Sequence, residues 1–192
     1  TLQAIVDAAV RDHVSYIDIR QDLRRTTTTM RLLESGTFHF KTPEEARNLA
    51  MLLAHAYPNA DRVVTGILEL TLNAIEHGNL SIGYKEKSRL IEEDKLEEEI
   101  AHRLSSPPYS SRVATAKFSR QPHGLSLHIT DQGNGFDWKN YMDFDPERAF
   151  DTHGRGIAMA NKVSFDRIEY RGNGNQVLTV FNLEQVAPAL AV

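Results

Sequence analysis

The first 35 residues carry a hydrophobic pattern that repeats every seven positions. With Leu2 at position a and Ile5 at position d, apolar side chains fill most of the equivalent positions as far as Met30 and Leu33. This pattern is typical of a helix with a continuous hydrophobic seam. We predict that residues 1–35 form a helical linker that dimerises as a coiled coil. The alternative is one long helix lying on its own domain, and the threonine run at 26–29 weakens the helix there.

Two helices are predicted after a short alternating strand at residues 37–41. Thr42, Pro43 and Glu45 form a helix start, because Thr can cap, Pro needs no N–H at the first position, and Glu completes a capping box. The second helix covers residues 60–77, ends at Gly78, and is apolar around much of its axis, which predicts extensive burial. The buried stripe of the first helix is expected to consist of Leu49, Leu52, Leu53 and Ala56.

The second half of the chain reads mainly as strands. Residues 85–104 are highly charged and predict one helix on the surface, within an insertion at about residues 80–111. Strands at 113–119 and 124–130 form a hairpin, a short helix begins at Gly156, and residues 163–170 and 176–182 form a second hairpin. The predicted fold is α+β, a two-layer sandwich with helices on one face of a mixed, mostly antiparallel sheet, plus the N-terminal helix.

Composition narrows the function classes. The net charge is −4, with basic and acidic residues interspersed, which argues against nucleic acid as a partner. The chain has no cysteine and no apolar run near the roughly 20 residues of a membrane span. We expect a cytoplasmic protein without a membrane segment. Because residues 1–10 read as helix without a cap, we also expect the chain to continue on the N-terminal side.

Polar side chains at helical spacing mark a candidate site on the second helix. Glu69 and Asn73 are four residues apart and therefore share a face. Burying them without partners is unfavourable, and Mg²⁺ with nucleotide phosphates would supply partners, since Mg²⁺ prefers oxygen ligands. Taken alone, this spacing also fits a pair of solvent-facing polar residues.

Two glycine-containing segments add to this site. Asp131 follows an apolar strand, where its carboxylate can accept a hydrogen bond from an exocyclic amine such as that of adenine, and Gly133 and Gly135 allow a sharp turn close to a flat ligand. Gly154, Arg155 and Gly156 open a short helix whose N-terminus favours an anion. An ordinary turn and an ordinary helix entry are the alternatives, but one ATP site explains all three elements together.

These three segments resemble the N, G1 and G2 boxes of the GHKL ATPase superfamily. The matching residues are Glu69 through Gly78, then Asp131 through Phe136, then Gly154 through Gly156, within about residues 36–183. Within the superfamily the chain is most similar to anti-sigma-factor serine kinases. The resemblance implies that Glu69 is the catalytic residue, as the general base or as the residue that orients water, that Asn73 ligates Mg²⁺, and that Asp131 reads adenine. It further assigns ATP binding to Asn73, His77, Asp131, Gly133, Gly135, Phe136, Gly154, Arg155 and Gly156, with residues 137–155 as the ATP lid.

The resemblance therefore predicts a kinase domain at residues 36–186 that uses ATP and Mg²⁺. We expect it to phosphorylate Ser or Thr of an anti-sigma-antagonist-like or sigma-regulator partner in bacterial signal transduction. The helix and insertion are also similar to ATPase domains of two-component response regulators, which implies an N-terminal receiver domain. His13 lacks the setting of a phospho-accepting histidine, and Glu76 stands where histidine kinases carry Lys. The alternatives are a non-catalytic ATP-binding switch that sequesters a regulator, or a histidine kinase ATPase domain whose His lies elsewhere.

Overall fold

The computed structural model describes residues 25–142 and 156–184. A five-stranded sheet forms one layer, in the order β1-β2-β3-β5-β4. Every pairing between these strands is antiparallel, so the described sheet has no mixed character. The strands are β1 Ser35–Phe40, β2 Ala114–Gln121, β3 Gly124–Thr130, β4 Arg167–Arg171 and β5 Gln176–Asn182.

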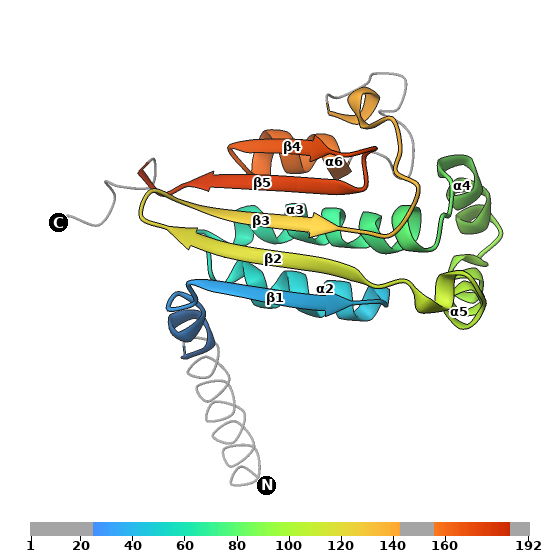
Figure 1. Cartoon of the computed structure of the whole chain (residues 1–192), viewed down its shortest axis with the longest axis horizontal. Coiled ribbons are helices and arrows are strands. Elements are labelled where there is room, and N and C mark those ends of the chain that lie inside the picture. Colours follow the sequence, from blue (N-terminus) through green and yellow to red (C-terminus); the bar gives the residue numbers. More distant parts are fainter. Residues whose placement is uncertain (1–24, 143–155, 185–192) are drawn as a thin grey trace, which may run out of the picture.

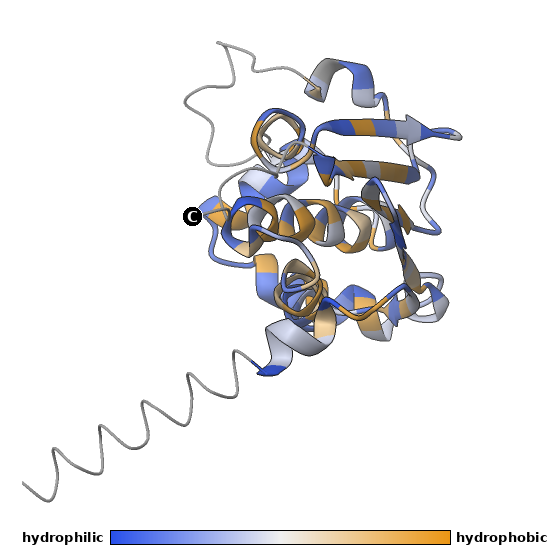
Figure 2. Cartoon of the chain, turned by 90° about the vertical axis from the view of Figure 1, so that its left-hand side faces the viewer, coloured by the Kyte–Doolittle hydropathy of each residue, from blue (hydrophilic) through white to orange (hydrophobic). Residues whose placement is uncertain are grey.

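Three helices form the second layer on one face of the sheet (Figure 1). They are α2 Pro43–Ala54, α3 Ala60–Asn73 and α6 Gly156–Met159, the last continuing as a π-helical turn over Ala160–Ser164. Alternating hydrophobic and hydrophilic bands along the strands (Figure 2) follow from the two faces of the sheet, one turned to the helices. The predicted two-layer α+β sandwich is confirmed. The second hairpin begins later than expected, because residues 163 and 164 complete the preceding helix.

The start of α2 forms as predicted. The Thr42 hydroxyl accepts from the Glu45 N–H at 3.1 Å, and the Glu45 carboxylate accepts from the Thr42 N–H at 3.0 Å, which completes the capping box. The predicted buried stripe is wrong at Leu52, which is 37% exposed, because Ala46, Leu49, Ala50 and Leu53 define the inward face. Ala56 is buried but lies beyond the end of α2.

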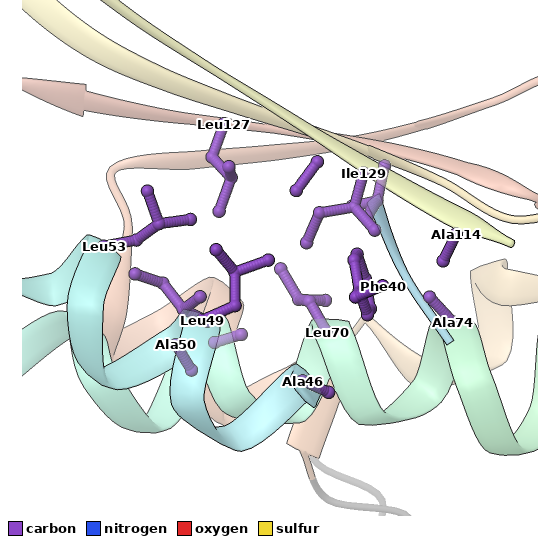
Figure 3. Packing of buried hydrophobic residues seen from close by; sticks show 14 of the residues in the cluster. Phe40, Ala46, Leu49, Ala50, Leu53, Leu70, Ala74, Ala114, Leu127 and Ile129 are labelled. Atoms are coloured by element: carbon purple, nitrogen blue, oxygen red, sulfur yellow. The ribbon is translucent and has the colours of Figure 1, made fainter. Parts of the chain in front are cut away.

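The core lies between the sheet and the paired helices α2 and α3. Leu49 and Leu53 of α2 and Leu70 of α3 point toward Leu127 and Ile129 of β3 (Figure 3). Burying each such side chain contributes roughly 1.5–3 kcal/mol. At the other end of the core, three rings surround the Tyr57 ring edge-on, with centroid distances of 5.5–6.3 Å: Phe118, Phe165 and Phe181.

The end of α3 differs from the prediction. The α-helix stops at Asn73 and continues as a π-helical turn over Ala74–Asn79, instead of ending at Gly78. The Leu80 N–H then donates to the Ile75 carbonyl at 2.8 Å. Wider turns of this kind are rare and are frequent at functional sites.

The charged segment forms two helices rather than the predicted one. They are α4 Tyr84–Glu92 and α5 Leu96–Ser105, and they stand beyond the end of the sheet toward which β3 points (Figure 1). Asp94, with φ of +54°, lies between the two helices and interrupts the helical conformation. Asp adopts this left-handed conformation more readily than most residues. The break allows both Leu90 and Ile100 to be buried, so these helices are packed on the domain along one side.

At the N-terminal end, residues 25–30 are helical and precede β1. The predicted coiled-coil seam falls mostly on residues 1–24, outside the described residues. No helix within residues 25–142 and 156–184 combines the length and apolar character needed to cross a membrane.

Candidate functional site

A cavity of about 770 Å³ opens between the C-terminal half of α3, helix α4 and the loop that follows β3. This volume is in the range of small-molecule and cofactor sites. Seven of the residues predicted from the sequence line it: Glu69, Asn73, His77, Asp131, Gly135, Phe136 and Gly156. Gly133 lies against the backbone of Gly78 at its edge, while Gly154 and Arg155 fall outside the described residues.

Glu69 and Asn73 lie one turn apart on α3, half-buried, and both face the cavity. Burial raises the pKa of the Glu69 carboxyl above its usual value; the positive charge of Lys87 opposes this rise and the charge of Glu76 adds to it. A Cβ at Gly156 would overlap the Glu69 carboxylate. The glycine that opens α6 therefore lets the Glu69 carboxylate approach the start of that helix.

Asp131 directly follows β3 and is anchored on both sides. Its N–H donates to the Asn175 carbonyl at 3.0 Å, and its Oδ1 accepts from the Gly133 N–H at 2.8 Å. Burial raises the pKa of Asp131 to about 6, and the Gly133 N–H opposes this rise. Gly78 lies directly beneath the carboxyl, where a Cβ would come within 2.8 Å of Asp131 Cβ and overlap its carboxyl group. The close approach of helix and loop thus requires glycine at position 78.

The turn between β4 and β5 holds the loop that follows Asp131. The Phe136 N–H donates to the Asn173 carbonyl at 3.1 Å, and the Asn173 side chain donates to the Asn134 carbonyl at 2.7 Å. Gly135 has φ of +74°, a conformation that side chains disfavour, and a Cβ there would also meet Asn173. The glycines of this loop therefore set its shape next to the cavity.

His77 is held in one orientation by the end of the π-helical turn. Its Nδ1 lies 2.6 Å from the Ile82 carbonyl, so Nδ1–H must donate because a carbonyl only accepts. Burial lowers the pKa of His77, partly offset by that hydrogen bond. The lowered pKa favours the neutral ring, in which Nδ1 carries the hydrogen and Nε2 is an acceptor.

Sequence reasoning missed the residues that tie the loop to the helix. The Asn79 Oδ1 accepts from the Gln132 N–H at 2.8 Å, and its carbonyl accepts from the Arg112 guanidinium at 2.8 Å. The Gln132 side chain in turn accepts from the Val113 N–H at 2.7 Å. The available signal was Asn79 itself, a polar residue between Gly78 and Leu80 that would need partners once buried.

Helix α4 contributes two further residues to the cavity wall, Tyr84 and Lys87. The Tyr84 ring lies 6.3 Å from that of Tyr141, which lies 5.7 Å from Phe136. Alongside, Trp138 is stacked on Tyr170 at 5.7 Å. The expectation that residues 85–104 form only a solvated surface is therefore wrong for the inner side of α4, which closes one end of the cavity.

The donor set of the cavity fits a nucleotide with a divalent cation. Asp131 supplies an acceptor for an amine at one wall, with apolar side chains around it such as Ile129 and Val177. At the other wall, Asn73 and Glu69 offer the amide and carboxylate oxygens that Mg²⁺ prefers. Mg²⁺ bound there would take its remaining ligands from phosphates and water.

Fold and cavity together define a nucleotide-binding domain built as helices on an antiparallel sheet. Residues 19–181 match the family of histidine kinase-like ATPase domains, and the chain belongs to that family. It is thus an ATP-binding domain of the GHKL type. A search of curated proteins found no match to the chain.

Proposed function

We propose that this domain is an ATP- and Mg²⁺-dependent protein kinase that phosphorylates a Ser or Thr of a regulatory partner of the anti-sigma-antagonist type. The observation that carries the proposal is the pairing of Glu69 and Asn73, one turn apart, on the wall of one cavity. Phosphoryl transfer depends mainly on positioning and charge stabilisation, so one base and one metal ligand suffice.

Asn73 would hold Mg²⁺, which supplies charge neutralisation for the phosphates when bound. Glu69 accepts the proton of the attacking Ser or Thr hydroxyl. The hydroxyl oxygen forms a bond to the γ-phosphorus while the bond between that phosphorus and the leaving ADP oxygen breaks. A carboxylate whose pKa is raised by burial is a stronger base than one in water, and so suits this role. Asp131 orients the nucleotide by accepting from the adenine amine, which directs the phosphates toward Asn73.

The test separates binding from chemistry. Glu69→Gln should leave Mg-ATP affinity within a few-fold and reduce phosphotransfer or hydrolysis by roughly 10²–10⁴, the contribution of a positioned base. Asn73→Ala should abolish Mg²⁺-dependent ATP binding. Asp61→Asn, an exposed acid in the first turn of the same helix, is the matched control and should behave as wild type. If Glu69→Gln turns over ATP at the wild-type rate, Glu69 is not the catalytic base.

The acceptor is tested with γ-labelled ATP and a purified partner of the anti-sigma-antagonist class. We expect acid-stable phosphate on Ser or Thr of the partner. Acid-labile phosphate would instead indicate a histidine acceptor. ATP binding without transfer or hydrolysis in the presence of partner would favour the non-catalytic switch.

A further inference from the structure

Lys87 is distinctive among the cavity residues. Within residues 25–142 and 156–184, no other Lys or Arg lines the cavity. Its ammonium forms an ion pair with the Glu76 carboxylate, and the two side chains are 15% and 6% exposed. Glu76 itself does not line the cavity. It lies behind Lys87 and fixes the ammonium at the cavity wall.

The ion pair with Glu76 places Lys87, which belongs to α4, beside the C-terminal end of α3. Glu69 and Asn73 share one face of α3, and Glu76 lies in the π-helical turn that continues this helix. Lys87 pairs with Glu76 in that turn, and its charge also acts on Glu69. The ammonium therefore belongs to the Glu69–Asn73 wall.

The charges of the cavity call for a cation at this wall. Glu69 and Asp131 both line the cavity, and Glu76 lies behind Lys87. A nucleoside triphosphate would bring further negative charge, which Mg²⁺ only partly neutralises. The Lys87 ammonium provides a positive point charge with three N–H donors, from which phosphate oxygens can accept hydrogen bonds.

We propose that Lys87, supplied by helix α4 and positioned by Glu76, binds the terminal phosphate of ATP and so distinguishes ATP from ADP. This inference rests on the proposed use of ATP in the cavity. Lys87 keeps its contact with Glu76 on one side and reaches the phosphate on the other, as an ammonium with three N–H donors can. Helix α4 thereby takes a direct part in nucleotide recognition.

The experiment is calorimetric titration of the full chain with Mg-ATP, Mg-ADP and adenosine. Lys87→Met should weaken ATP binding roughly 10- to 100-fold, the usual effect of losing a charge-assisted hydrogen bond. The affinity of Lys87→Met for ADP and adenosine should differ from wild type by less than about threefold. Lys87→Arg, which keeps the positive charge, should retain most of the wild-type ATP affinity. Lys85→Met removes the same charge from an exposed position two residues away on α4 and should match wild type.

A second variant guards against an effect of the buried carboxylate. Lys87→Met alone leaves Glu76 unpaired, which can destabilise the fold or repel phosphate. Lys87→Met combined with Glu76→Gln removes both charges, and it should show the same loss of ATP affinity. Recovery of ATP binding in the double variant, or equal losses for ATP and ADP, would overturn the assignment. If wild type binds none of the three ligands, the proposed function itself fails, a result distinct from unchanged ATP affinity in Lys87→Met.

Discussion

Replacing Asp131 with Asn should change stability and ligand binding in opposite directions. Burial raises the pKa of Asp131 from its ordinary 3.8 to about 6, so the folded state disfavours the ionised form. At about 1.4 kcal/mol per pKa unit, the ionised carboxylate costs the ligand-free fold up to about 3 kcal/mol at neutral pH. Asn retains an oxygen for the Gly133 N–H but carries no charge. Asp131 is partly exposed, and solvent screens part of this cost. We therefore expect Asp131→Asn to raise the free energy of unfolding by about 1–3 kcal/mol.

The sign of the pH dependence follows from the raised pKa. Above about pH 6, Asp131 is ionised in both states, and wild type bears the full cost. As pH falls below 6, the folded state takes up its proton first, so the cost shrinks and disappears below about 3.8, where both states are protonated. Urea denaturation at pH 7.5 and at pH 5 should therefore show a stability difference between variant and wild type that narrows with acidification.

The same variant should bind ATP more weakly. Asn presents a neutral acceptor to the adenine amine in place of a carboxylate, which removes a charge-assisted bond worth roughly 1.5–3 kcal/mol. Calorimetry at pH 7.5 should then show at least a tenfold loss of Mg-ATP affinity in a protein that is more stable than wild type. A variant that is less stable than wild type at pH 7.5, or that retains wild-type affinity, would refute the reasoning about this carboxyl.

Two further predictions concern the surroundings of the cavity. Gly78→Ala should lower both stability and ATP affinity, because its Cβ would overlap the Asp131 carboxyl. Gly83→Ala, whose Cβ would meet no atom within 4 Å, should melt at the wild-type temperature, and equal thermal stability of the two variants would contradict the close packing at Gly78. Trp138, the single tryptophan, is stacked on Tyr170 of the cavity wall, so its fluorescence should change on titration with ATP and saturate at the calorimetric affinity. A flat titration in protein that binds ATP by calorimetry would separate Trp138 from the site.

The sequence was informative where local chemistry decides the structure. The capping box at Thr42 and the alternation of Leu125, Leu127 and Ile129 depend on neighbouring residues only, and both form as predicted. Glu69 and Asn73 share a face because of helical geometry. The loop after β3 lines the same cavity because β3 ends beside the C-terminal end of α3.

Features that depend on tertiary contacts were not predictable in this way. The charge pattern of residues 85–104 indicated a solvated helix, and nothing local identified Lys87 as the partner of Glu76, eleven residues earlier. The break at Asp94 follows from the need to bury Leu90 and Ile100 on the same domain. A buried carboxylate such as that of Glu76 needs a cation nearby, and this need would have pointed to one of the neighbouring lysines as its partner.

The central claim is that ATP occupies this cavity with its adenine at Asp131 and its phosphates at the Glu69–Asn73 wall. A crystal structure of the full chain with Mg²⁺ and a non-hydrolysable ATP analogue tests it most directly. We predict the exocyclic amine within hydrogen-bonding distance of an Asp131 oxygen, the metal on the Asn73 amide oxygen, and the terminal phosphate facing Glu69. A nucleotide bound elsewhere, or one whose adenine lies away from Asp131, would contradict the account.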